Sequence, residues 1–518
     1  MKFNIIYVSS HCLSLEIENN TPFYSEKSYN VLVNDEIYKE NVNTNVTSVF
    51  DLKSDSEYKI SVDDGVEVTS ATITTSHEYV TLNVKRFGAI GDGVSDDTNF
   101  IQTCINACPK DGRVYFPEGT YFVKPLFLKS NITIELSKNA KILGDTDRRN
   151  YPILPGVIAT TDELDEYNLG TWEGNPLDCF ASIITGIEVE NVNIIGEGTI
   201  DGNACNGDWW NNEKAKNIAW RPRGMFLVRC KNINVCGITI CNTPSWNLHP
   251  YFSDYIRFIN LNVLNPADSP NTDGCDPESC DHVDIIGINF SVGDDCIAVK
   301  SGKIYMGRKH KKPSSNFTIR NCAMNFGHGA IVLGSEMAGG IKDFVISKCF
   351  FNHTDRGLRI KSRRGRGKDA IIDGITFDNI KMDSVLTPLV INMYYFCDPD
   401  GKSEYVWSKE KLPVDDRTPY LGHFVFKNME CTNVNVAAGT FYGLPEMPIE
   451  SVELDNIKFT YDPEAKPGVA AMMTGCEPMV NRGLIFFNVK NVKMHNVTLP
   501  GSIKNDIELT NVESFINE

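Results

Sequence analysis

The chain has 518 residues, of which 42% are hydrophobic and 23% charged, and its formal net charge is −17. This composition predicts a folded protein with one large core and a smaller one, and it excludes a wholly disordered chain. The negative charge argues against non-specific nucleic-acid binding, which needs a basic surface to displace counterions from phosphates. A polyanionic ligand would therefore have to meet a locally basic site.

Residues 1–20 contain only a brief apolar stretch without a small-residue cleavage site, and no long apolar run follows them. We therefore expect a cytoplasmic protein without a membrane partner, or a secreted one if a signal has been removed. The sequence does not determine the oligomeric state.

The sixteen cysteines include no C-x-x-C pair. Five of them lie within apolar, strand-like runs: Cys230, Cys236, Cys296, Cys322 and Cys349. Such positions are typical of free core thiols in a reducing compartment. We expect no zinc site, no other metal and no cofactor.

Residues 1–78 alternate apolar and polar positions in short runs separated by Asn, Asp, Ser and Gly turns. The runs are Leu13–Ile17, Tyr29–Val33, Tyr58–Val62 and Val66–Ile73. They predict a small β-sandwich. Leu52 and Tyr58 are similar to the tyrosine-corner signature of fibronectin type III domains, although any seven-stranded sandwich fits this segment as well.

One amphipathic helix is predicted after a turn-rich stretch. Its apolar positions recur at helical spacing behind two potential capping residues, Ser95 and Asp96, and they are Phe100, Ile101, Cys104, Ile105 and Cys108. A helix at this place would lie across the end of the following domain. It would thereby block end-to-end pairing of strands.

Residues 79–518 carry short β-branched runs with no long helix between them. The clearest runs are Val192–Ile195, Ile233–Ile240, Ile256–Val263, Val283–Ile288, Phe317–Ile319, Phe344–Ile346, Ile375–Phe377 and Val452–Phe459. A strand-only repeat of roughly 20–40 residues predicts a right-handed parallel β-helix, so the expected fold class is all-β. Asparagines recur near the starts of these runs, where their amides could bond from coil to coil or simply serve ordinary loops: Asn191, Asn232, Asn260 and Asn316.

Four polar motifs follow one another at coil-like intervals: Asn271-Thr-Asp-Gly-Cys-Asp, Gly293-Asp-Asp-Cys, Gly327-His-Gly and Arg359-Ile-Lys. Asp273 precedes Asp294 by 21 positions. Because rungs of a β-helix stack about 4.8 Å apart, residues one coil apart meet on the same face. Asp273, Asp294 and Asp295 are therefore expected to crowd one spot and to raise at least one pKa. An Asp-Asp pair alone would more often end a strand or bind calcium, but the other motifs favour catalysis.

Glycoside hydrolysis needs a protonated carboxylic acid and an ionised carboxylate, and a crowded Asp cluster supplies both. His328 is expected to tune the shared proton or bind a hydroxyl, with an ordinary loop histidine as the alternative. Arg359 and Lys361 alternate onto one face of a strand, where Arg can bind a uronate carboxylate through two parallel hydrogen bonds. The basic residues at 363–368 and 308–312 fit solvated loops that steer a polyanion.

Trp209, Trp210, Trp220 and Trp246 are candidates for stacking on sugar rings, with a position in the core as the alternative. Trp246 is the preferred platform because Pro-Ser-Trp-Asn-Leu-His249 lies just before the coil of Asp273.

The four motifs resemble those of glycoside hydrolase family 28, the polygalacturonases and rhamnogalacturonases, over roughly residues 80–515. The resemblance implies an inverting enzyme with Asp294 as general acid, Asp273 and Asp295 as bases that activate water, and His328 beside them. It also implies a substrate-contacting Tyr one coil beyond Arg359, for which Tyr395 is preferred over Tyr394. The expected substrate-binding residues are Asn271, Arg359, Lys361, Tyr395, Trp246, His249, Lys300 and Glu336.

The N-terminal sandwich and the segment Gly334-Ser-Glu-Met-Ala-Gly-Gly340 resemble an exo-acting bacterial branch of the family. Insertions at 202–223 and 396–419 are expected to close one end of the cleft. We therefore expect exo-acting hydrolysis of galacturonan or oligogalacturonides, with an acidic saccharide as the only partner. The alternatives are an endo-polygalacturonase, a rhamnogalacturonan hydrolase, a calcium-dependent pectate lyase, and a non-catalytic carbohydrate-binding β-helix.

Overall fold

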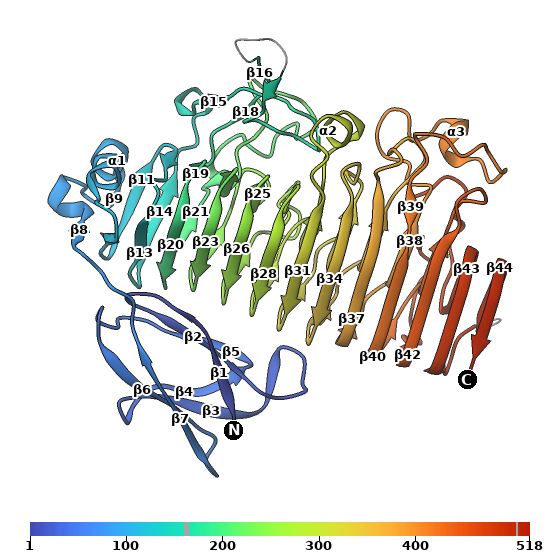
Figure 1. Cartoon of the computed structure of the whole chain (residues 1–518), viewed down its shortest axis with the longest axis horizontal. Coiled ribbons are helices and arrows are strands. Elements are labelled where there is room, and N and C mark those ends of the chain that lie inside the picture. The colour runs from blue at the N-terminus through green and yellow to red at the C-terminus, as the bar shows by residue number, and fades with distance from the viewer. Residues whose placement is uncertain (160–164, 504–505) are drawn as a thin grey trace.

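A computed structural model describes residues 1–159, 165–503 and 506–518 of the chain. Its main body is a long solenoid of stacked parallel strands, and a smaller all-β unit lies beneath the N-terminal half of that solenoid in Figure 1. The solenoid is the parallel β-helix that the strand repeat predicts. No helix among the described residues is long and apolar enough to cross a membrane.

The N-terminal unit consists of two antiparallel sheets. One contains β1 (Phe3–Val8), β2 (Leu13–Ile17) and β5 (Val46–Val49), and the other contains β4 (Glu36–Thr44), β3 (Tyr24–Val33), β6 (Glu57–Asp63) and β7 (Val68–Thr74). The hydroxyl oxygen of Tyr58 accepts a hydrogen bond from the backbone N–H of Lys53 at 2.8 Å. This contact agrees with a tyrosine corner, whereas the fibronectin type III assignment and the domain limits stay predictions.

Each coil of the solenoid contributes strands to rows in which neighbours pair in parallel. The first row holds β12 (Leu126–Phe127), β19 (Ile184–Ile187), β22 (Met225–Val228), β25 (Leu248–Tyr251), β30 (Ile297–Val299), β33 (Ile331–Gly334), β36 (Arg356–Lys361), β38 (Thr387–Asn392), β41 (Ala437–Tyr442) and β43 (Arg482–Thr498). Bridges through Cys275 join β25 to β30. This row carries the candidate site.

The second row holds β10 (Gly112–Phe116), β13 (Ile132–Leu136), β20 (Glu190–Gly196), β23 (Lys231–Cys236), β26 (Asp254–Ile259), β28 (Asp281–Ile286), β31 (Ser314–Arg320), β34 (Ile341–Ser347), β37 (Ile371–Asp383), β40 (His423–Val434), β42 (Ile449–Tyr461), β43 and β44 (Ile507–Asn517). The third row holds β11 (Gly119–Val123), β14 (Ala140–Gly144), β21 (Thr199–Asp201), β24 (Thr239–Cys241), β27 (Asn262–Leu264), β29 (Asn289–Ser291), β32 (Ala323–Asn325) and β35 (Phe350–Asn352). Loops beside the first row carry β15 (Ile153–Leu154), β16 (Ile158–Ala159), β17 (Glu166–Tyr167), β18 (Cys179–Phe180), α2 (Ile304–Lys309) and α3 (Glu404–Trp407), whereas β39 (Tyr420–Leu421) pairs with β37 of the second row.

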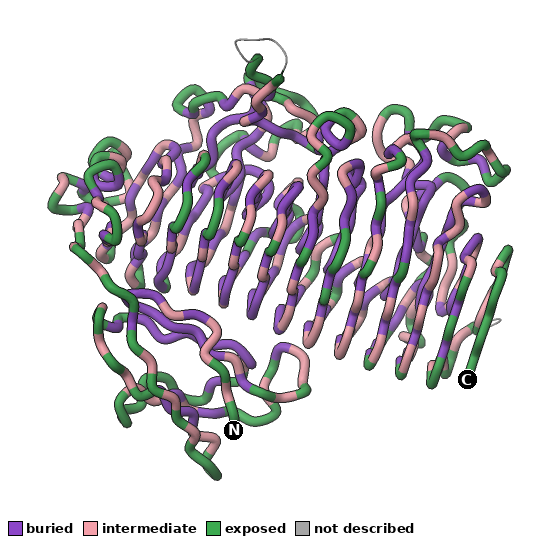
Figure 2. The backbone as a smooth tube through the Cα atoms, in the orientation of Figure 1, coloured by how far each residue is buried: buried purple, intermediate pink, exposed green. Residues whose placement is uncertain are grey.

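Alternation along the strands places apolar side chains inside the solenoid, and buried positions alternate with intermediate and exposed ones along many of its strands (Figure 2). Phe317 and Phe344, on consecutive coils, stack with ring centroids 4.3 Å apart. The five cysteines at strand-like positions are buried, as predicted: Cys230, Cys236, Cys296, Cys322 and Cys349. The core is therefore built from the runs that the sequence pattern identifies.

The predicted coil-to-coil bonds form for three of the four asparagines, and two of them pair with another asparagine. Asn232 donates to Asn191 at 2.8 Å, and Asn191 donates to Asn131 at 2.9 Å. A third, Asn316, also bonds to the preceding coil, but to the carboxylate of Asp281 at 2.7 Å, whereas Asn260 donates to Ser48 of the N-terminal unit and does not follow the prediction. Each of the four has a positive φ, which Asn tolerates better than most residues.

The helix at the start of the solenoid is α1 (Thr98–Ala107), and it buries Ile101, Cys104 and Ile105 as predicted. The predicted cap at Ser95 is wrong, because the helix begins after Asp97, but the Asp96 carboxylate accepts the backbone N–H of the first helical residue, Thr98, at 3.1 Å. The Asp97 carboxylate does not cap the helix but accepts the backbone N–H groups of Ile90 and Gly91 at 2.7 and 2.9 Å. It thereby closes the preceding turn.

The N-terminal unit docks along the turns between the second and third rows. Tyr7 donates to Asn193 at 2.9 Å, and Glu16 lies 3.0 Å from Arg320. Phe50 lies directly against Gly237, where a Cβ atom would overlap the Phe50 ring and a backbone carbonyl. The glycine therefore permits the close approach of the two parts.

Gly237→Ala is expected to destabilise the protein by about 1–3 kcal/mol more than Gly475→Ala, because only the first substitution overpacks an interface. Both glycines have positive φ, +85° and +78°, but nothing lies within 4 Å of a Cβ at Gly475. The matched pair thus separates steric overlap from backbone strain. Urea unfolding of both variants measures the difference, and equal losses would contradict the close docking.

Candidate active site

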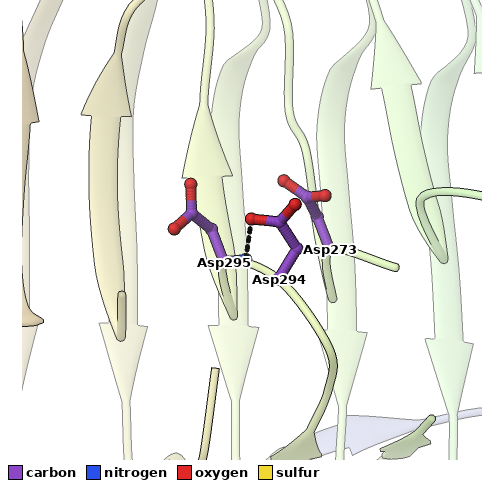
Figure 3. Close-up of side chains that lie close together, drawn as sticks. All are labelled: Asp273, Asp294 and Asp295. Carbon is purple, nitrogen blue, oxygen red and sulfur yellow. Dashed lines mark hydrogen bonds between the residues drawn. The ribbon is translucent and has the colours of Figure 1, made fainter. Parts of the chain in front are cut away.

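Asp273, Asp294 and Asp295 meet on neighbouring coils of the first row. The backbone N–H of Gly274 donates to the carbonyl oxygen of Asp295 at 2.9 Å, which places Asp273 beside Asp295. One carboxylate oxygen of each Asp lies within 4.8 Å of the others, and Figure 3 shows the three side chains side by side. The crowding that the 21-residue spacing predicts is therefore observed.

Two cations hold the carboxylate of Asp295. Nη1 of Arg359 lies 3.1 Å from its Oδ1, and Nζ of Lys361 lies 2.8 Å from its Oδ2. Gly329 leaves room between them, since a Cβ there would contact Asp295 and Arg359. Burial acts to raise the pKa of Asp295, but Lys361 and then Arg359 outweigh it and hold that pKa well below its usual range. Asp295 is therefore ionised.

Asp273 has the opposite environment. It is 5% exposed, and its Oδ1 has no hydrogen-bond partner among the described residues. Burial, followed by the nearby Asp276 and Asp294 carboxylates, raises the pKa of Asp273 well above its usual range. The protonated form of Asp273 is thus favoured, which differs from the base role that the resemblance implies, whereas the ionised form of Asp295 is favoured.

Asp294 is the most accessible of the three carboxylates, with 23% of its side chain exposed. Nδ1 of His328 lies 3.2 Å from its Oδ1, and this hydrogen bond raises the pKa of His328. Asn271 donates to Asp294 at 3.4 Å and is itself held by Arg221. Asp294 is therefore anchored on one side and open to the cleft on the other.

A second layer of charge lies beside the cluster. Nζ of Lys300 lies 3.0 Å from Asp276 and 3.9 Å from Glu336. Burial raises the pKa of Asp276 to about 7 and that of Glu278 to about 8. Glu336 stays acidic, with a pKa of about 2, because Lys300 outweighs the effect of its burial. The sequence did not predict a role for Asp276 or Glu278 in the site, although Asp276 ends the motif Asn271-Thr-Asp-Gly-Cys-Asp.

Trp246 and His249 do not reach the cleft, contrary to prediction. Trp246 is 3% exposed, and Trp172 covers one face of its ring at a centroid distance of 5.3 Å. His249 is fully buried and lies 3.3 Å from Glu278. Both side chains therefore form the wall behind the site and offer a sugar no free face.

An unpredicted residue, Trp172, joins separate loops into that wall. Its ring stacks on Trp220 at 4.8 Å and on Trp246 on the other side. Trp209 packs instead in a separate small core with Tyr151 and Phe180. No local pattern could have identified Trp172, because its partners lie far away in the sequence.

The two tyrosines after the Arg359 motif occupy different places. Tyr394 is fully buried and donates to the carbonyl oxygen of Gly443 at 2.9 Å. Tyr395 lies beside the site, with Nζ of Lys361 5.8 Å from its ring centroid. The placement agrees with the preference for Tyr395, whose substrate contact stays a prediction.

The three carboxylates also lie close enough to hold a cation. Both oxygens of Asp295, however, already contact Arg359 and Lys361. These positive groups would repel a divalent ion, so the side chains present fit proton transfer better than metal binding.

A carboxylate cluster with both protonation states, set beside cations on a parallel β-helix, defines a glycoside-cleaving enzyme of the β-helix class. The model of the glycosyl hydrolases family 28 matches residues 130–466, and a rhamnogalacturonase A/epimerase, pectate lyase-like model matches residues 81–157. The chain belongs to glycoside hydrolase family 28.

Several known proteins are similar to this chain. A probable polygalacturonase of Vitis vinifera is 29% identical over 391 residues, covering 73% of this chain and 74% of that protein. The exopolygalacturonase from Thermotoga maritima has a TM-score of 0.64 at 25% identity, covering 80% of this chain and 91% of that one. The family 28 exopolygalacturonase of Yersinia enterocolitica has a TM-score of 0.68 at 19% identity, covering 99% and 98%, and shows the fold alone.

Proposed function

We propose that the protein hydrolyses the α-1,4 bonds of polygalacturonate or its oligomers. The observation that carries the proposal is the pair Arg359 and Lys361, two cations at the carboxylate cluster of a chain with net charge −17. A uronate is the sugar whose charge they would complement. The names of the similar proteins from Vitis vinifera and Thermotoga maritima support this substrate.

In the proposed mechanism the exposed Asp294 donates a proton to the glycosidic oxygen as its bond to C1 breaks. The ionised Asp295 takes a proton from a water that attacks C1, so the products are a hemiacetal and a free hydroxyl. His328 keeps Asp294 in place, and the proton at Asp273 keeps a second negative charge away from Asp295. Catalytic roles for these residues rest on geometry together with the family.

The stereochemical outcome of hydrolysis at C1 can be measured directly. Two-carboxylate inverting sites usually keep their carboxyls about 6.5–9.5 Å apart, whereas the closest oxygens of this three-carboxylate cluster lie within 4.8 Å. We propose inversion on the strength of family membership. Proton NMR of the first product would show the β-anomer, and an initial α-anomer would contradict inversion.

We also propose exo action. The Trp172 stack holds loops against one side of the site, and Asp398 ties the 396–419 insertion to Lys303 at 2.9 Å and to Arg366 at 3.0 Å. If these loops close one end of the site, it would admit a chain end and exclude the middle of a chain. The Yersinia and Thermotoga exopolygalacturonases have similar overall folds.

Chromatography of products over time, on polygalacturonate and on oligomers of defined length, tests both proposals. Early release of only mono- or digalacturonate is expected, without a rise in ultraviolet absorbance and with full activity in EDTA. A spread of lengths would mean endo action, and an absorbance rise that needs calcium would mean a lyase. No product from galacturonan would direct the same assay to rhamnogalacturonan.

A further inference from the structure

A strap formed by residues 468–479 lies over the side of the site that carries Arg359 and Lys361. Its two ends pair through backbone bonds between Gly468 and Met479 at 2.8 and 2.9 Å. Arg356 donates to the carbonyl oxygen of Ala470 at 2.8 Å, and Asn392 donates to that of Met472 at 3.2 Å. The strap is therefore fastened to the first row of strands.

The strap leaves little space beside Arg359 and Lys361, the two cations proposed to bind a uronate. The cavity bounded by Arg359, Lys361, Tyr395 and residues 470–472 has a volume of about 10 Å³. A cavity needs about 10–15 Å³ to hold a single water. No sugar ring can occupy it while the strap keeps this position.

The contact that fills this space is a weak one. Nη2 of Arg359 lies directly against Sδ of Met472, while its Nη1 bonds to Asp295. A thioether is a poor hydrogen-bond acceptor, whereas a carboxylate forms a short, charge-assisted bond with a guanidinium. A bound uronate would thus give Arg359 a much better partner than Met472.

We propose that Met472 is a specificity-determining residue whose side chain occupies the uronate position of the free enzyme and turns away when a carboxylate binds Arg359. The inference rests on the proposed function for its ligand. Because a neutral sugar cannot replace the thioether with a stronger partner, Met472 favours acidic over neutral chains. Displacing Met472 costs free energy, and this cost lowers the apparent affinity for substrate.

Met472→Glu tests the proposal, since a carboxylate built into the strap would compete with the substrate for Arg359. We expect it to raise KM for polygalacturonate about 10-fold or more and to leave kcat within about twofold. This pattern arises when the ground state and the transition state lose the same amount of binding free energy. Met472→Gln, of similar size without charge, is expected to stay within about threefold. Thr474→Glu adds the same charge on an exposed position of the same strap and is expected to leave KM unchanged.

A substrate-free measurement separates this inference from the proposed function. In protein labelled at the methionine methyl groups with ¹³C, the Met472 signal, assigned from Met472→Gln, is expected to shift in Arg359→Ala and on adding trigalacturonate. No shift in Arg359→Ala, or equal KM effects of Met472→Glu and Thr474→Glu, would overturn the inference. If the wild type does not cleave galacturonan, the proposed function fails, while the Arg359→Ala spectrum still decides whether Met472 makes this contact.

Discussion

Asp294→Asn is expected to lower kcat on polygalacturonate by about 10³-fold or more while leaving KM within about threefold, as loss of a general acid does. The substitution is nearly isosteric, and its amide can still accept a hydrogen bond from Asn271. The side chain loses only its ability to give a proton to the leaving oxygen. Initial rates of reducing-end release measure the effect.

Asp268→Asn is the matched control, because Asp268 is an exposed carboxylate on the loop that precedes Asn271. It should retain wild-type kcat. Comparable losses in both variants would mean that charge on this loop, rather than proton donation, limits the reaction. Calorimetry is expected to show that Asp294→Asn still binds trigalacturonate. Intact binding together with lost hydrolysis would argue against a protein that only binds carbohydrate.

Lys361→Met is expected to lower kcat/KM by about 10²-fold, or about 2.7 kcal/mol, and to move the acid limb of the pH profile to higher pH. Lys361 is the first of the two cations that hold the pKa of Asp295 well below its usual range. Removing it leaves the effect of burial less opposed, so the pKa of Asp295 rises. Asp295 is then protonated, and inactive as a base, at a pH where the wild type still works.

The pH dependence of kcat/KM between pH 3 and 8 measures this shift. Lys368→Met is the control, because Lys368 is exposed in the basic stretch after the Arg359 motif. It should change neither the acid limb nor the rate at high salt. An unchanged acid limb in Lys361→Met would show that another group sets it.

The fold and the centre of the site could be predicted from the sequence because both follow from the strand repeat. Backbone pairing brings residues one coil apart together, so the interval between Asp273 and Asp294 was enough to place them side by side. The same reasoning placed Arg359 and Lys361 on a later coil of the site, but their contact with Asp295, and the gap at Gly329 that lets Arg359 reach back two coils, became visible only in three dimensions.

The walls of the site could not be predicted in this way. Trp246 was expected to present a face to sugar, but Trp172 covers it from a loop that begins more than one coil earlier. The strap over Arg359 is likewise contributed by residues more than 100 positions further along the chain. Such contacts depend on the way in which the long loops fold over the rows of strands, and no periodic pattern in the sequence encodes that fold.

The backbone bond from Gly274 to Asp295 joins two adjacent rungs of the solenoid, and the distance between these rungs is the same whatever the length of the intervening loop. Insertions such as 202–223 or 396–419 can therefore lengthen without moving the reacting carboxylates apart. Chemistry and substrate choice are thus encoded in separable stretches of the chain. Loop exchange between members of the family should alter which saccharide is accepted while bond cleavage continues.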